Sequence, residues 1–160
     1  MRYRKHFSQK VGHSVTALTP VTISSVDREA LTQLTRERTG LAQAFWRATL
    51  VDQAVLCAWV VSLGRRDVYT RVAHQVCELH ARMKALGLAN GAAFDLPLTQ
   101  EQLADALGLT SVHVNRVLKR LRDEGLMELR NRTITLLNPE RLAATAAFNP
   151  SYLHLTGASL

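Results

Sequence analysis

The chain has 160 residues, of which 47% are hydrophobic and 21% are charged. This composition is typical of a folded globular protein and argues against wholesale disorder. Its 20 lysines and arginines outnumber 13 aspartates and glutamates, for a formal net charge of +7. A basic chain favours a polyanionic partner. The basic residues are spread along the sequence, however, so the net charge alone does not locate a binding site.

The sequence carries no signal for secretion or for a membrane. Its start is basic but lacks the apolar stretch of a signal peptide. We find no uninterrupted run of about 18 apolar residues that would span a bilayer. Cys57 and Cys77 have no Cys-x-x-Cys spacing and are expected to be reduced thiols. We therefore expect a cytoplasmic protein without a membrane partner.

The first 38 residues mix short β-branched stretches with polar residues. Residues 14–24 are rich in valine, threonine and serine around Pro20, which predicts one or two short strands. Because an isolated pair of strands is barely stable in water, we expect these strands to be covered or frayed. Asp27 is placed to cap a short helix over residues 28–35.

Residues 40–63 form a long helical pattern without an internal glycine or proline. Small and aliphatic residues recur along it at spacings of three and four, a heptad seam that lets two helix backbones approach closely. A second stripe from Phe45 to Leu63 predicts additional packing on a neighbouring domain. The alternative is a central helix in the core of a monomer. We expect a dimer interface at the seam residues Leu41, Ala44, Ala48, Val51, Val55, Ala58 and Ser62.

Asp67 is placed to cap the next helix, which is expected to run to about Leu86. Four residues on this helix have side chains that can bind metals, but they do not complete one tight face. They are expected to be polar residues beside an amphipathic stripe, so no metal site is predicted. Glycines end the helix, and residues 94–97 follow as a short extended segment. The four residues are His74, Cys77, Glu78 and His80.

Residues 98–125 predict two short helices joined by a tight turn. Thr99 and Gln102 have the spacing of a capping box, which places the start of the first helix. Gly108 supplies the turn, and the hydroxyl of Thr110 is available to cap the second helix. Leu103, Ala104 and Leu107 of the first helix are expected to face inward.

The second helix has two distinct faces when its residues are projected at 100° each. The inner face consists of Val114, Val117, Leu118 and Leu121. On the opposite strip, Arg116 could pair with guanine and Asn115 could read adenine, while an exposed Val112 would suit a thymine methyl group. Lys119, on the same strip, is expected to contact phosphate. The alternative is an ordinary solvated helix face with one stray valine.

A β-hairpin is expected after this helix, with strands over residues 126–129 and 133–137. Asn131 tolerates the positive φ of a tight turn. Arg130 and Arg132 flank it, which suits contact with phosphates. Asn138 and Pro139 then begin another helix, and residues 149–150 are expected to open one last turn.

From about residue 13 to 155 the chain resembles the C-terminal half of the Crp/Fnr regulators, the family of the cyclic-AMP receptor protein. The motifs that carry the resemblance are LPLTQEQLADALGLT at residues 96–110 and VHVNRVL at residues 112–118. The family implies a mainly α fold with a small β component, in which a long dimerisation helix precedes a winged helix-turn-helix. The implied domains are a remnant of an effector-binding β-roll over 1–38, the dimerisation helix over 39–64 and the DNA-binding domain over 65–160.

By the same resemblance, the residues that read bases are expected to be Ser111, Val112, Asn115 and Arg116. The residues expected to contact DNA phosphates are Thr99, Gln100, Thr110, His113, Arg130 and Arg132. Well-known members carry an arginine or another polar residue at the position of Ser111 and a glutamate at that of Val112. Their operator sequences are therefore not expected to carry over.

A second departure concerns the sensor. Only about 38 residues precede the long helix, whereas family members carry a whole β-roll there. We find neither a glycine-rich phosphate cradle nor a cluster of cysteines. The expectation is a chain without a cofactor that does not bind a cyclic nucleotide in the family's usual way. It would be a truncated paralogue or a reading frame that starts internally.

These observations predict a sequence-specific transcription regulator that binds double-stranded palindromic DNA as a homodimer. A contact with RNA polymerase is a further partner suggested by the resemblance. The alternative is an interaction protein that forms heterodimers with a full-length relative and modulates it. An enzyme is not expected, because no serine–histidine–aspartate arrangement, acid pair or metal spacing stands out.

Overall fold

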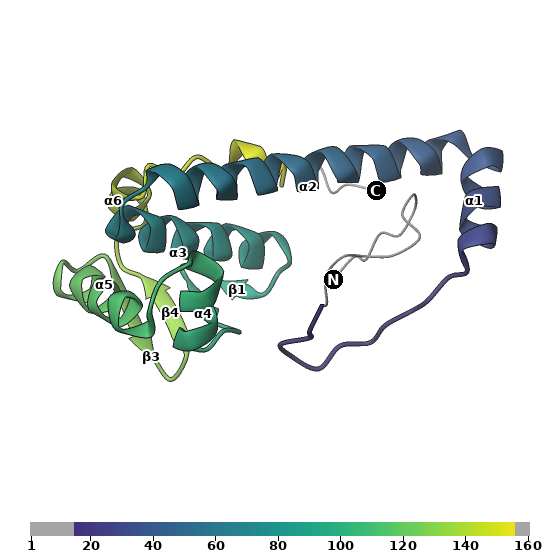
Figure 1. Cartoon of the computed structure of the whole chain (residues 1–160). Coiled ribbons are helices and arrows are strands. Elements are labelled where there is room, and N and C mark those ends of the chain that lie inside the picture. The colour runs from purple at the N-terminus through teal and green to yellow at the C-terminus, as the bar shows by residue number, and fades with distance from the viewer. Residues whose placement is uncertain (1–14, 156–160) are drawn as a thin grey trace. The chain divides into compact units, whose positions relative to one another are not determined.

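The computed structural model of the chain describes residues 15–155, and Figure 1 shows their helices and strands. The chain divides into two compact units, unit 1 up to Asp52 and unit 2 from Gln53 onward. The division falls within the long helix α2, Thr39–Arg65. Each unit is described by itself.

Unit 1 contains helix α1, Arg28–Glu37, and the first half of α2. The Asp27 carboxylate accepts a hydrogen bond of 3.0 Å from the Glu29 N–H, which confirms the predicted cap. The prediction of strands over residues 14–24 is wrong for the part that the structure describes, because residues 15–27 form no strand. A strand needs a neighbour to pair its backbone groups, and the side chains of this segment are exposed. Residue 14 lies outside the described residues.

Helix α2 confirms the long helical pattern and extends it at both ends. By length and composition it could also cross a membrane. The search for an uninterrupted apolar run missed this property, because the few polar residues of α2 are scattered among apolar ones. The same composition serves a helix that pairs with another chain.

Unit 2 contains most of the regular structure (Figure 1). Its helices after α2 are α3, Val68–Ala85; α4, Gln100–Leu107; α5, Ser111–Asp123; α6, Pro139–Thr145; and the 3₁₀ turn η1, Pro150–Leu153. Its strands are β1, Ala89–Asn90; β2, Ala93–Asp95; β3, Met127–Arg130; and β4, Thr133–Leu136. The strands form one antiparallel sheet in the order β1-β2-β4-β3, in which Phe94 pairs with Ile134. A mainly α fold with a small β component is thus confirmed.

Helix α3 is the centre of unit 2. Asp67 caps its start as predicted, accepting hydrogen bonds from the Tyr69 and Thr70 N–H groups. Residues 72–78 are all buried, so the middle of α3 is covered around its circumference. Helices α5 and α6 pack against it, as do strands β1 and β2. The four residues that raised the question of a metal do not gather around a common point, and no group of three candidate ligands occurs within the described residues.

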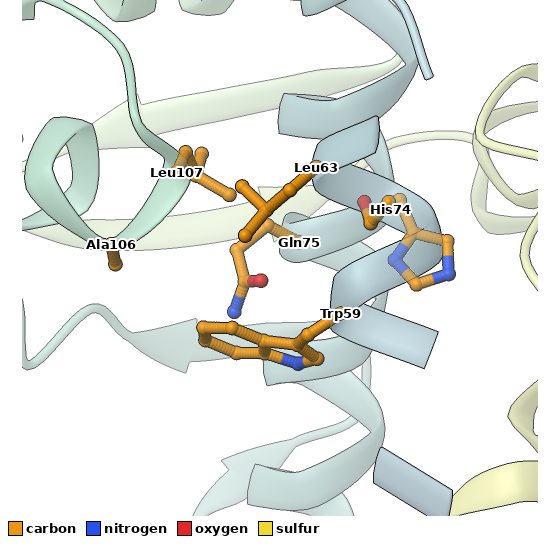
Figure 2. A pocket seen from close by; sticks show the side chains of 7 residues that line it. Trp59, Leu63, His74, Gln75, Ala106 and Leu107 are labelled. Carbon is orange, nitrogen blue, oxygen red and sulfur yellow. The ribbon is translucent and has the colours of Figure 1, made fainter. Parts of the chain in front are cut away.

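Part of the predicted dimer seam is covered by the chain itself. Ser62 is 7% exposed and lines a small cavity with His74 and Gln75 of α3 and Leu107 of α4. Figure 2 shows the Gln75 amide directed across this cavity toward the Trp59 ring. The assignment of Ser62 to a dimer interface conflicts with its burial, because a buried side chain offers no surface to a second chain.

The burial of His74 predicts a pH-dependent stability. His74 is 3% exposed, and its ring stacks on Tyr152 and meets the edge of Phe148. Burial, followed by the charge of Arg66, lowers the pKa of His74 to about 4, while Glu78 opposes this shift. The unfolded chain therefore takes up a proton below about pH 6.5 that the folded chain refuses. The free energy of unfolding should fall between about pH 7 and pH 4, by at most about 3 kcal/mol.

Urea denaturation at a series of pH values measures this dependence. His74→Phe retains an aromatic ring against Phe148 but cannot titrate, so it should flatten the profile. His154→Gln, at an exposed position, is the matched control and should keep the wild-type slope. Parallel profiles for wild type and His74→Phe would show that His74 does not cause the dependence.

Candidate DNA-binding interface

Helix α4 begins and ends where its sequence directs. The Thr99 Oγ1 accepts from the Gln102 N–H at 3.1 Å, and the Gln102 Oε1 accepts from the Thr99 N–H at 2.8 Å. This reciprocal pair is the predicted capping box. The helix ends at Gly108, whose φ of 61° is strained for residues with a side chain. Its three predicted core residues are buried: Leu103, Ala104 and Leu107.

Helix α5 follows immediately and presents one buried and one exposed face. The Thr110 Oγ1 caps it by accepting a 3.3 Å hydrogen bond from the His113 N–H. The helix packs against α3, α4 and β3. The predicted inner face is confirmed, because the buried residues of α5 are Val114, Val117, Leu118 and Leu121.

The other face of α5 brings the predicted base-reading residues together at the surface. Val112 is 63% exposed although it is apolar. The Arg116 side chain makes no hydrogen bond or ion pair with any residue in the range 15–155, whereas Lys119 pairs with Asp123 at 2.9 Å. Exposed ion pairs of this kind are weak, so a phosphate could replace Asp123. The exposed members of this face are Ser111, Val112, His113, Asn115, Arg116 and Lys119.

The predicted hairpin is present as β3 and β4, joined by a two-residue turn. Asn131 and Arg132 both have positive φ, at 50° and 68°, as the commonest turn of this length requires. Asparagine was the recognisable signal, and the positive φ of Arg132 was not predicted. The Arg130 side chain is 80% exposed and pairs with Glu128 at 3.2 Å. Both arginines are exposed.

A cluster around Glu124 anchors the C-terminal end of α5. The Tyr69 hydroxyl donates to the Glu124 carboxylate, and the Arg120 Nε donates to it at 2.7 Å. The Arg120 guanidinium also lies 4.1 Å from the centre of the Tyr69 ring. Burial and the bond to Glu124 raise the pKa of Tyr69 to about 12. The bonds from Tyr69 and Arg120 lower the pKa of Glu124.

Arg71 connects α4 to the end of α2. Its Nη1 donates to the Leu107 carbonyl at 3.1 Å, and its Nη2 donates to the carbonyls of Leu63 and Arg66, each at 3.0 Å. A guanidinium at the C-terminal carbonyls of two helices is favourable, because these carbonyls lack partners within their helices. Sequence reasoning missed Arg71 and Tyr69, since the partners lie as far as 55 residues away and leave no local pattern.

The Crp-like helix-turn-helix domain matches residues 70–145 of this chain. This chain carries the DNA-binding domain of the Crp/Fnr regulators. The transcriptional activator FnrL of Cereibacter sphaeroides is 32% identical over 124 residues, which cover 76% of this chain and 50% of FnrL. The nitrogen fixation regulation protein FixK of Rhizobium meliloti is 30% identical, over 79% of this chain and 54% of FixK.

Among solved structures, FixK2 of Bradyrhizobium japonicum superimposes with a TM-score of 0.70 at 28% identity. The match covers 78% of this chain and 61% of FixK2. This chain thus spans about half the length of the curated relatives it matches. The relatives are named as regulators rather than as enzymes. The predicted resemblance to the C-terminal part of the Crp/Fnr regulators, with a Crp-like helix-turn-helix, is therefore confirmed.

The Tyr69–Glu124 bond predicts a measurable contribution to stability. Tyr69→Phe keeps the ring under Arg120 but removes one donor from the Glu124 carboxylate. It should lower the free energy of unfolding, because the Glu124 carboxylate loses the hydrogen bond from the Tyr69 hydroxyl. Urea denaturation measures the change.

A double-mutant cycle with Glu124→Ala provides the control. The double variant should be less destabilised than the sum of the two single variants, because both remove the same interaction. Additive losses would mean that the bond contributes nothing to stability.

Proposed function

We propose that this chain is a sequence-specific transcription regulator that acts as a homodimer on palindromic DNA in the cytoplasm. The observation that supports it best is the exposed face of α5, where Arg116 has no partner among the described residues and Val112 is open to solvent. An unpaired arginine beside an exposed valine is favourable when DNA is bound, because a guanine edge can accept from the arginine and a thymine methyl group can contact the valine.

The four base-reading residues are assigned by chemistry. The guanidinium of Arg116 can donate two parallel hydrogen bonds to guanine O6 and N7, and the Asn115 amide can both donate to and accept from adenine. Val112 would contact a thymine methyl group. Ser111, in the first turn of α5, has a hydroxyl that suits either kind of base. An operator read by this set would differ from one read by a glutamate at the position of Val112.

The phosphate contacts are proposed to surround this face. Thr99 and Gln100 lie at the start of α4, and Thr110 and His113 at the start of α5, where free backbone N–H groups favour an anion. Lys119 extends the contact along α5. Arg130 and Arg132 would reach the backbone from the hairpin turn. All seven side chains are exposed in the structure.

A homodimer would form through α2, on a different side from the seam expected from the sequence. A second heptad series, at spacings of four and three, lies on the opposite side of the helix. Trp46 and Val60 are each 69% exposed, and Leu50 and Cys57 are also exposed. We propose that a second copy covers this exposed stripe. Its members are Trp46, Leu50, Gln53, Cys57, Val60 and Gly64.

The dimer has a structural advantage for function as well. The stripe exposes large apolar side chains that cost free energy in water and are favourable when covered. A two-fold dimer would present two α5 helices to successive major grooves about 34 Å apart. Because FnrL is named a transcriptional activator, contact with RNA polymerase is part of the proposal. Transcription in vitro from a promoter bearing the selected site tests that part, and no stimulation would contradict it.

Two substitutions on α5 should separate base reading from phosphate contact. Arg116→Ala should cost about 1–3 kcal/mol at the preferred site and relax discrimination at one base pair. Lys119→Ala should weaken binding to all sequences alike and reduce the salt slope by about one. Sites selected from a random pool, titrated by fluorescence anisotropy at several salt concentrations, provide the measurement.

Arg36→Ala on α1 removes the same charge from a residue outside the helix-turn-helix and is the control, with base discrimination expected to stay as in wild type. If Arg116→Ala weakened all sequences equally, its role as a base reader would be refuted. A wild-type chain that bound its selected site no better than random DNA would refute the proposed function.

A matched pair of substitutions tests which side of α2 pairs. Leu50→Lys places a charge in the exposed stripe and should raise the dimer dissociation constant by about a hundredfold. Ala44→Lys places the same charge in the seam expected from the sequence, at an exposed position, and should leave the dimer intact. Sedimentation equilibrium measures both. If Ala44→Lys weakened the dimer and Leu50→Lys did not, the seam expected from the sequence would be the interface. A wild-type chain that stays monomeric and pairs only with a co-expressed full-length relative would favour the heterodimer.

A further inference from the structure

Glu78 is a buried carboxylate that joins three segments of unit 2. It belongs to α3 and is 1% exposed. The Trp59 Nε1–H of α2 donates to both of its oxygens, at 3.0 and 3.1 Å. The Tyr152 hydroxyl of η1 donates at 2.5 Å, and the Arg82 guanidinium pairs with it at 2.7 Å from the next turn of α3.

The donors match what a buried carboxylate needs. A carboxylate removed from water is costly unless charged or polar donors occupy its oxygens. Burial and the neighbouring Glu78 hold the pKa of Tyr152 far above its ordinary value, so the phenol remains protonated and can donate. Each donor is therefore held in place by the carboxylate, and α2 is attached to α3 through the Trp59 indole.

A second attachment lies further along α2. Arg71 of α3 binds the carbonyls of Leu63 and Arg66, and the same guanidinium binds Leu107 at the end of α4. One attachment would leave a helix free to swing about it. Two attachments at different turns, at Trp59 and near Leu63, fix the direction of this part of α2 against α3 and α4.

We propose that the Trp59–Glu78 contact is a positioning device that sets the half-site spacing at which the dimer binds DNA. The proposal rests on the proposed function, in which α2 pairs with a second copy. In such a dimer each α5 is carried by its own α2, so a swing at this joint changes the separation of the two α5 helices. The separation of the two α5 helices must match the distance between successive major grooves. Otherwise only one of the two DNA-binding domains can bind.

Trp59→Phe tests the contact, because it keeps an aromatic ring but removes the N–H that reaches Glu78. Tyr152→Phe is the matched control: it also removes one donor from the same carboxylate, but from η1 rather than from α2. Affinities are measured for a single half-site and for palindromes whose half-sites are moved apart one base pair at a time. Thermal unfolding of each variant is recorded in parallel.

The wild type should bind the palindrome with the best spacing about tenfold or more tightly than the others. At other spacings the second DNA-binding domain of the dimer cannot reach its half-site. Trp59→Phe should reduce this preference to about threefold or less, with half-site affinity within about twofold of wild type. Tyr152→Phe should keep the wild-type spacing preference even where its stability falls as much as that of Trp59→Phe.

An unchanged spacing profile for Trp59→Phe would overturn the proposal. An equal loss of preference in Tyr152→Phe would overturn it as well, because the carboxylate would then act through stability and not through the direction of α2. Failure of the proposed function has a different signature. A wild type that binds a half-site as tightly as any palindrome would refute the homodimer, and the positioning role with it.

Discussion

The burial of α3 on every side is the constraint on which the rest of unit 2 depends. Residues 72–78 include polar as well as apolar side chains, and all of them are removed from water. To be buried on every side, α3 must be covered by other elements of unit 2. Helices α5 and α6 and the strands β1 and β2 contact it, and these contacts set their positions. The exposed face of α5 follows from this packing, because its aliphatic face is held against α3.

The polar groups that this arrangement buries are the ones that join its parts. Glu78 needs donors and obtains them from α2 and η1. The Arg71 guanidinium donates hydrogen bonds to the backbone carbonyls at the C-terminal ends of α2 and α4. Arg116, by contrast, is free of partners within residues 15–155. The hydrogen bonds of Glu78 and Arg71 therefore join the segments of unit 2, while the Arg116 guanidinium remains available to a base.

Local signals in the sequence predicted most of the elements near the candidate site. Caps such as Thr99 and Thr110, and Gly108 at the end of α4, act through neighbours within a few residues and can be read directly. The inner face of α5 followed from its periodicity. The Tyr69–Glu124 and Arg71–Leu107 contacts could not be predicted, because they depend on how distant segments pack. The strands expected before Asp27 failed for the same reason, since strand formation depends on a partner.

The long helix α2 shows most clearly which properties follow from the sequence and which depend on the tertiary structure. The sequence by itself determined that residues 40–63 form a helix with apolar heptad spacing, because periodicity and the lack of an internal proline act locally. It did not determine which side of that helix is free, since two heptad series run along opposite sides. Tertiary structure decided the exposure of single positions: Ser62 is buried and lines a cavity with residues of α3 and α4, while Trp46 and Val60 are exposed. The physical reason is that burial depends on what lies beside a helix, and the helix's own periodicity contains no information about its neighbours.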